Sequence, residues 1–336
     1  MTSELEKYYA TNYSLCNCND SFLTSWQGLA ILTHAVQFVS LPFQVLAFYV
    51  ILKKTPSVMS AMKMPLLANF SCGALLELLI CSITTPYIHF HSLAFQGFGL
   101  LNWFNVSLWL QLSSGLLACL ILAASYVFIF ESRSNCIRIN RLRILKGRDR
   151  AVYHILVNVF AYGGLTYLWL IPEDQEAARL ATLKVEPCPA REFFLSEALV
   201  LNTDKELIFF AKWILGPVYL LNMTCHSLFH IFCTIYYLYI APTKTVSAET
   251  RKSQKRFFVG IILQTSIPLS LVVTVGIVVM VDGITNGLTQ RITNLLVISI
   301  STFSFLESIC VILVHKVYRQ AVITMIKSKL GIGKFR

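Results

Sequence analysis

Two histidines and a cysteine lie at the spacing of metal ligands in one apolar stretch. His226 and His230 are four residues apart and Cys233 follows three residues later, so a helix would present all three side chains on one face. No fourth ligand and no carboxylate that could orient a histidine is evident nearby. Because a neutral histidine in a helical core can bond to a hydroxyl or a carbonyl group instead, we favour that reading over a metal centre.

Two acidic side chains, Glu77 and Glu307, interrupt other apolar stretches. Inside a bilayer an ionisable group costs about 2.5–3.5 kcal/mol, so each should face the interior of a helix bundle. We expect each acid to be neutral, ion-bound or hydrogen-bonded to polar neighbours, such as Asn69, Ser71, Ser301, Ser304 or Ser308. These contacts are either static or able to repack between two helix arrangements.

Catalytic chemistry has little support in this chain. Glu77 and Glu307 fall at different depths of their stretches, which argues against a carboxylate pair that acts on one substrate. The HExxH, GxSxG and phosphate-loop motifs are all missing from the sequence. We therefore expect neither an enzyme nor a bound cofactor.

Three of the ten cysteines fall outside the apolar stretches and the loops expected in the cytosol, namely Cys16, Cys18 and Cys188. In an oxidising compartment a disulfide is the default fate of a nearby pair. Our hypothesis is that Cys188 pairs with Cys16 or Cys18 and ties the amino-terminal tail over the mouth of the bundle. Three free cysteines are the alternative.

Glycosylation sequons begin at Asn12 and Asn19, in the same tail. We expect at least one of them to be modified if the tail faces outward. The three-residue pattern also recurs inside predicted spans, where it cannot be used, at Asn69, Asn105 and Asn222.

Seven long apolar stretches must position these residues. Each has about twenty residues or more, enough helix to cross a hydrocarbon core of about 30 Å. The chain is 56% hydrophobic and 13% charged, with a mean hydropathy of +0.64, far from a soluble globular composition. The sequence predicts an all-α membrane protein with a seven-helix bundle, whose spans cover approximately residues 26–52, 64–88, 98–130, 151–171, 207–240, 257–281 and 292–314.

Basic residues predict the orientation of this bundle. The net charge of +11 could suggest nucleic acid, but most of the 28 lysines and arginines fall in alternate loops on one side of the predicted membrane. The positive-inside rule then puts the N-terminus outside and the C-terminus in the cytosol. The basic loops would meet anionic lipid head groups and an acidic cytosolic partner.

The domain organisation follows from the spans. We expect an extracellular tail over residues 1–25, a seven-helix domain over residues 26–314, and a cytosolic basic tail over residues 315–336. Apolar residues recur every three or four positions after the seventh span, which predicts a short amphipathic helix on the inner leaflet. Pro217 and Pro268 fall within the fifth and sixth spans, where each removes a backbone hydrogen bond and permits a bend.

Short motifs are spread along nearly the whole chain. They are Cys16-x-Cys18, Lys54-Thr55-Pro56 with Met59 and Lys63, Pro86-Tyr87, Phe130-Glu131-x-Arg133, Asp174-Gln175, Pro187-Cys188-Pro189, Phe257-Phe258, Gln264 with Pro268, and Tyr318-Arg319. In order and spacing these motifs resemble those of nematode serpentine receptors of class H, a family of seven-helix chemoreceptors. The family usually has an aspartate where Glu77 stands and a proline where Val317 stands.

The resemblance implies a multi-pass receptor of the plasma membrane, on the cilia of sensory neurons. It would bind a small environmental chemical, odorant-like or pheromone-like, within the bundle and activate a heterotrimeric G protein. Glu131 and Arg133 would then bias the inactive state at the end of the third span. From the residues alone they could be an interfacial ion pair worth less than about 1 kcal/mol. The opened inner face would receive the G protein, with further basic candidates at Arg251, Lys252, Lys255 and Arg256.

A ligand-gated ion channel or a small-molecule transporter is the alternative. Seven-helix odorant channels of the insect type keep their N-terminus inside, against the distribution of charge in this chain. Transporters commonly show paired halves and several intramembrane charges along a path, and the sequence has neither feature.

Overall fold

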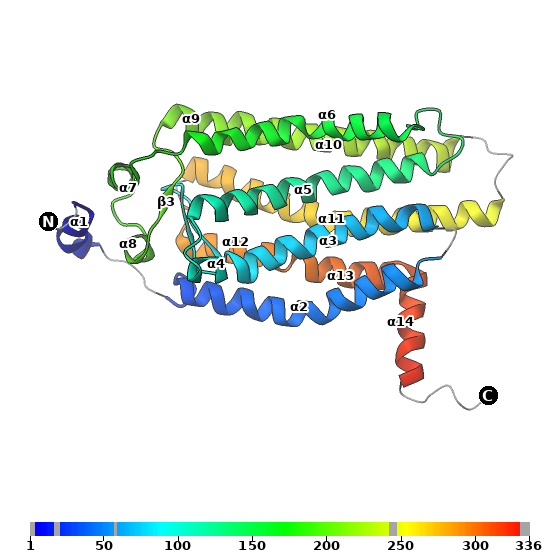
Figure 1. The fold of residues 1–336 in the computed structure, drawn as a ribbon, viewed down its shortest axis with the longest axis horizontal. Coiled ribbons are helices and arrows are strands. Elements are labelled where there is room, and N and C mark those ends of the chain that lie inside the picture. Colours follow the sequence, from blue (N-terminus) through cyan, green and yellow to red (C-terminus); the bar gives the residue numbers. More distant parts are fainter. Residues whose placement is uncertain (1–3, 17–20, 57–58, 242–246, 286, 330–336) are drawn as a thin grey trace.

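The computed structural model describes residues 4–16, 21–56, 59–241, 247–285 and 287–329, apart from the side chains of a few residues within helices. Within these residues, seven helices are long and apolar enough to cross a membrane. They lie side by side in one bundle, with α1 (Glu4–Thr11) beyond one end and α14 (Lys316–Lys329) at the other (Figure 1). The prediction of a seven-span helical bundle is confirmed.

Three of the spans are single helices, and four join several helical segments. Ser25, Ser107 and Thr289 cap the first, third and seventh spans by accepting backbone N–H bonds. In chain order the spans are α2 (Trp26–Lys54); α3 (Ser60–Leu78) with η3 (Leu79–Ile83); α5 (Leu108–Asn135); α6 (Gly147–Gly164) with η4 (Leu165–Leu170); α9 (Lys205–Phe210), η5 (Ala211–Leu215), α10 (Gly216–Ile235) and η6 (Tyr236–Ile240); α11 (Ala248–Thr285); and α12 (Gln290–Ser301) with α13 (Phe303–Val314).

Several spans depart from regular α-helix at defined points. The segments η3, η5 and η6 are π-helical turns. Pro217 lies in the first turn of α10, directly after η5, where its missing N–H falls beside a locally widened helix. Pro268 lies inside α11, but its side chain is outside the described part of the chain. The seventh span is interrupted at Thr302, between α12 and α13.

Residues 84–107 form a cap of strands and one short helix and do not continue the flanking spans, which corrects the predicted spans 64–88 and 98–130. Strand β1 (Pro86–His89) pairs antiparallel with β2 (Ala94–Gly97), which pairs antiparallel with β3 (Leu199–Val200), and the short helix α4 (Leu100–Trp103) follows β2. Thr85 and Asn105 have φ angles of 42° and 52°, which an α-helix cannot contain. A small sheet thus joins the helices of the predicted all-α fold.

The same end of the bundle carries a packed layer over the sheet. Helices α7 (Gln175–Leu183) and α8 (Glu192–Leu195) belong to the loop between the fourth and fifth spans. They share a buried apolar cluster with the strands, and Leu5 and Tyr8 of α1 pack against it. The hydroxyl groups of Tyr8 and Tyr13 donate to the carbonyl oxygens of Pro187 and Pro189, at 3.2 Å each.

A disulfide joins Cys16 to Cys188 in this layer, with 5.7 Å between their Cα atoms. The sequence left Cys16 and Cys18 as alternative partners of Cys188, and the structure contains the bond to Cys16. Cys18 and Asn19 lie outside the described residues. The amino-terminal tail is therefore covalently attached to the loop between the fourth and fifth spans.

At the opposite end, α14 projects sideways from the bundle at a steep angle to the bundle axis (Figure 1). Tyr318 is fully buried in the largest apolar cluster, and Val317 and Val322 pack against that cluster. The hydroxyl groups of Tyr318 and Thr55 lie 2.9 Å apart, which links α14 to the end of α2. Lys316 and Arg319 are exposed, as expected for an amphipathic helix.

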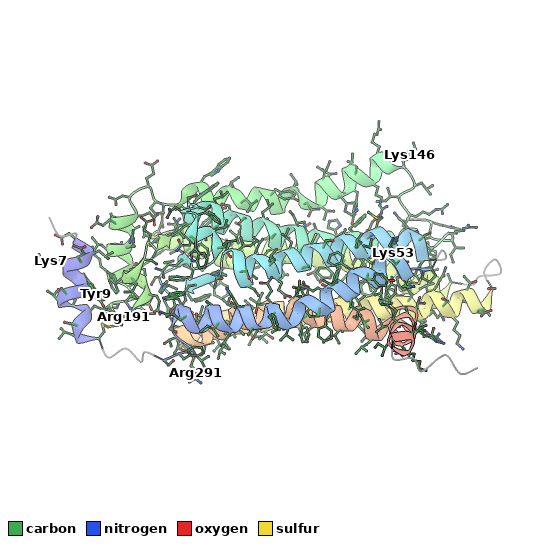
Figure 2. The ribbon with its side chains drawn as sticks, turned by 60° about the horizontal axis from the view of Figure 1, so that its bottom comes forward. Lys7, Tyr9, Lys53, Lys146, Arg191 and Arg291 are labelled. Atoms are coloured by element: carbon green, nitrogen blue, oxygen red, sulfur yellow. A yellow bond between two sulfur atoms is a disulfide. The ribbon has the colours of Figure 1, made fainter. Side chains whose placement is uncertain are left out.

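The two ends also carry the basic residues that define the predicted sides. Lys53 and Lys146 lie at the end of the bundle that holds α14, whereas Lys7, Arg191 and Arg291 lie at the other end (Figure 2). We call these the C-terminal end and the N-terminal end of the bundle. Lys53 and Lys146, which the sequence assigns to the cytosolic side, thus lie at one end of the bundle. The direction of insertion into the membrane stays a prediction.

Candidate functional site

Glu131 is a fully buried acid in the last turns of α5 and the centre of a polar cluster at the C-terminal end. Arg150 of α6 donates two hydrogen bonds to Glu131 Oε2, from Nε at 2.8 Å and from Nη2 at 2.5 Å. Nε2 of His154, one turn further along α6, lies 3.5 Å from the same oxygen. Asn135 donates a short hydrogen bond to Oε1. The carboxylate of α5 is therefore held by α6.

Arg133 lies two residues further along α5 but takes no part in that cluster. Its Nη2 donates to the carbonyl oxygen of Gln254 in α11 at 2.9 Å, and its guanidinium group lies 5.5 Å from the centre of the Phe257 ring. Arg133 is 4% exposed, and its Nε has no hydrogen-bond partner. Within the described residues no carboxylate lies within ion-pair distance of Arg133. The possible ion pair between Glu131 and Arg133 is thus absent from that part of the chain.

A pocket of about 400 Å³ opens beside Arg133, between the start of α3, the end of α5 and the start of α11. Its wall is mainly apolar, and the buried guanidinium group is the cation in it. A buried arginine that lacks an acidic partner favours binding of a hydrogen-bond acceptor or an anion. The lining residues are Met59, Ala61, Met62, Arg133, Cys136, Glu249, Thr250, Ser253, Gln254 and Phe257.

The other basic candidates lie in the first turns of α11, near this pocket. Arg251 Nε donates to the carbonyl oxygen of Leu238 at 2.8 Å, and Lys255 Nζ lies 4.2 Å from the centre of the Tyr239 ring. Both side chains therefore reach back to η6 of the fifth span. Lys252 and Arg256 are exposed. The structure brings the basic candidates to the same end as Arg133, although they do not line the pocket.

Glu77 and Glu307 are both buried inside the bundle, at 2% and 0% exposure. Gln264 of α11 donates to Glu307 Oε1 at 2.8 Å, and Asn69 donates to the hydroxyl oxygen of Ser125 at 2.8 Å. Ser40, Gln44 and Ser304 surround the carboxyl group of Glu77. Of the expected polar neighbours, Ser71 is exposed and donates to the carbonyl oxygen of Leu67.

His226 and His230 converge on one hydroxyl group. The hydroxyl oxygen of Tyr153 lies 3.1 Å from His226 Nδ1 and 2.9 Å from His230 Nε2. Cys233 is buried on the same helix. Within the described residues no three His, Cys, Asp or Glu side chains form a group suited to a metal ion. The pair of histidines thus makes the hydroxyl contact that the sequence suggested as an alternative to metal binding.

Asn12 is exposed beside the 3-10 helix η1 (Tyr13–Leu15) at the N-terminal end, and its side chain is accessible for a glycan. Asn105 was expected inside the third span, where its sequon could not be used. The structure places it instead in an exposed turn that precedes Leu108, the first residue of α5.

Sequence reasoning missed Arg150, His154, Ser40 and Gln44. Arg150 and His154 are four residues apart on α6, so one helix face carries both. That spacing was the available signal, but nothing in the sequence showed which acid the pair would meet.

The seven-helix bundle and the order of the motifs along the chain are those of a class of membrane receptors. The family model of serpentine seven-helix G-protein-coupled chemoreceptors of the Srh type matches residues 24–328, and the chain belongs to this family. It is also 30% identical over 321 residues to serpentine receptor class H-72 of Caenorhabditis elegans, which covers 94% of this chain and 91% of that protein. No solved structure matches.

Together with the seven apolar helices, this match shows that the chain is a multi-pass membrane protein and that its family consists of chemosensory receptors. The family is one of receptors rather than of enzymes.

Proposed function

We propose that this protein binds a small environmental chemical, odorant-like or pheromone-like, within the bundle and activates a heterotrimeric G protein at the C-terminal end. It would act in the plasma membrane of sensory neurons, at their cilia. Residues 1–25 would form an extracellular tail and residues 315–336 a cytosolic one. The ligand would act by preferring one packing of the bundle, because a ligand shifts an equilibrium only by its differential affinity for the two states.

Two observations support this orientation. The Cys16–Cys188 disulfide lies at the N-terminal end, and disulfides persist in oxidising compartments rather than in the cytosol. The C-terminal end carries Lys53 and Lys146 (Figure 2) and the basic helix α14, which suits a surface that faces anionic lipids and the cytosol. A tag at the amino terminus should therefore be accessible on intact cells. A tag that is accessible only after permeabilisation would contradict the proposal and would favour a channel with the opposite orientation.

The observation that carries G-protein coupling is the pocket beside Arg133. It lies at the predicted cytosolic end, its wall is formed by three different spans, and it contains a buried cation whose Nε has no hydrogen-bond partner. A pocket between helices changes shape when the helices move, so it can report the packing of the bundle to a partner.

Replacement of Arg133 tests this assignment directly. We expect Arg133→Gln to reach the cell surface and to lose most of its G-protein activation, because the pocket loses its cation. Lys146→Gln is the matched control, since Lys146 is an exposed cation at the same end that does not line the pocket. Equal activation by Arg133→Gln and the unchanged chain, at equal surface amounts, would refute coupling through this pocket. A ligand-evoked current in cells that lack G proteins would favour a channel or a transporter.

A further inference from the structure

His315 is a buried histidine at the joint between the seventh span and α14. It follows Val314, the last residue of α13, and precedes Lys316, the first residue of α14, and it is 5% exposed. Its ring centre lies 5.0 Å from that of Phe257 in α11 and 5.5 Å from that of Tyr318 in α14. Its Nε2 atom is buried without a hydrogen-bond partner. The imidazole ring is thus enclosed between α11 and α14.

The backbone of α11 covers one side of this ring. A methyl group at Gly260 would lie 2.7 Å from Cε1 and 3.0 Å from Nδ1 of His315, so α11 approaches the ring more closely than a larger residue would permit. Through Phe257 the same helix also forms part of the wall of the pocket beside Arg133. Outward movement of α11 would therefore widen the pocket and expose the ring of His315 to water.

The surroundings of the ring disfavour a positive charge on it. Within the described residues no acid forms an ion pair with His315, and the hydroxyl group of Tyr318 contacts Thr55. Glu307, the acid of α13, accepts a hydrogen bond from Gln264 instead. Burial lowers the pKa of His315 from the ordinary value of 6.5 to about 4. The charged residues of α11, α13 and α14 within about two helical turns of these contacts are all cations, namely Arg251, Lys252, Lys255, Arg256, Lys316 and Arg319.

We propose that acid at the cytosolic face opens the C-terminal end of the bundle through His315, because its protonated ring is stable only when α11 has moved away. In the enclosed state the ring stays neutral, and in the opened state water solvates the charge, so that the pKa of the ring returns to about 6.5. The opened state then binds more protons than the enclosed state between about pH 4 and 6.5, and acid favours it.

The size of the effect follows from the two pKa values. The ratio of opened to closed receptors should rise about tenfold between about pH 7.5 and 5.5 and should change little above about pH 7.5. The effect of this movement on signalling rests on the proposed function, but the movement itself can be measured without a G protein.

The test measures the distance between α2 and α11 in the full chain, in lipid nanodiscs without ligand or G protein. Fluorescent amino acids replace Lys53 and Lys252, which are both exposed. Nanodiscs present both faces of the membrane to the buffer, so the direction of insertion does not affect the result. We expect the tenfold rise in the unchanged chain. His315→Gln should lose most of it, because glutamine does not titrate, whereas the control His91→Gln, in the hairpin of the cap, should retain it.

The unchanged chain provides a second readout, which holds even if His315→Gln does not fold. One proton taken up on opening requires the logarithm of the ratio to change by close to one unit per pH unit between about pH 5 and 6, and to level off above about pH 7. A ratio that does not depend on pH would overturn the proposal. A rise that survives in His315→Gln, or that only His154→Gln removes, would place the sensor elsewhere and would also overturn it. If acid moves α11 but no G protein is activated in any condition, the proposed function fails while this inference stands.

Discussion

Replacement of Arg150 by glutamine should raise signalling in the absence of ligand. Arg150 holds the buried Glu131 carboxylate with hydrogen bonds of 2.8 and 2.5 Å from its Nε and Nη2 atoms, and this contact fixes α6 against α5. Glutamine keeps much of the length of the side chain but removes the charge and the paired donors. If the active packing of the bundle separates these groups, the substitution destabilises only the inactive packing.

The magnitude follows from the contact. A hydrogen bond to a charged group contributes about 1.5–3 kcal/mol, and Arg150 makes two of them with Glu131. Its side chain is 33% exposed, so water replaces part of the loss, and we take about 2 kcal/mol as the net effect. This energy changes an equilibrium about 30-fold. A receptor that is active in about 1% of molecules would then be active in about a quarter of them.

The assay is ligand-free activation of a co-expressed G protein, measured by separation of its subunits and normalised to the amount of receptor at the cell surface. Arg148→Gln is the control, because it removes an exposed cation from the same helix without touching Glu131. Glu131→Gln and the double variant with Arg150→Gln complete a double-mutant cycle. Since both side chains form one contact, the double variant should signal no more than the stronger single variant. Basal signalling of Arg150→Gln at or below that of the unchanged chain, at equal surface amounts, would refute the reasoning.

Three further predictions concern other parts of the molecule. Cys188→Ser should change the mobility on a non-reducing gel and lower the surface amount, because the tail is no longer bonded to the loop; unchanged values for both would contradict the assigned disulfide. Gly260→Ala should lower the melting temperature, because its new methyl group would lie 2.7 Å from Cε1 of His315 and overpacking costs about 1–3 kcal/mol. The control Gly115→Ala should not lower it, because no atom lies within 4 Å of the new methyl group. Asn12→Gln should abolish a glycosidase-sensitive band shift, and a shift that persists in this variant would contradict modification of Asn12 alone.

The spans could be predicted because the bilayer imposes a length and a composition on each of them. The cap could not, because its strands have four residues or fewer, too few for an alternating pattern to identify them. Pro86, Tyr87 and Ile88 of β1 therefore read equally well as the end of a span. The positive φ of Thr85 stops the helix. Threonine has no preference for that conformation, so a threonine in the sequence does not predict it.

The candidate site was only half predictable. Glu131 and Arg133 were located by their motif, but their contacts depend on how α6 and α11 pack against α5. Arg150 lies 19 residues from Glu131 in sequence, beyond a loop that no local pattern describes. Gln44 and Ser40 were missed for a related reason, because neutral polar residues are common in membrane helices and only tertiary packing shows that they surround an acid.

The two ends of the bundle are held together differently, and this difference decides where the helices can repack. At the N-terminal end a disulfide, a three-stranded sheet and a buried apolar cluster join the tail, the hairpin and the loop between the fourth and fifth spans. These contacts break together and at high cost.

At the C-terminal end no disulfide joins the described residues: the helices share the apolar cluster that holds Tyr318, and around the pocket they also meet through separate polar contacts, from Arg150 to Glu131 and from Arg133 to Gln254. Each is worth about 1–3 kcal/mol, which is within the range that a ligand's differential affinity can supply. We therefore expect the helices to move at the C-terminal end while the cap stays fixed. Hydrogen exchange should then be slow in β1 and β2 in every state of the receptor, and a state-dependent change in these strands would show that the cap takes part in the switch.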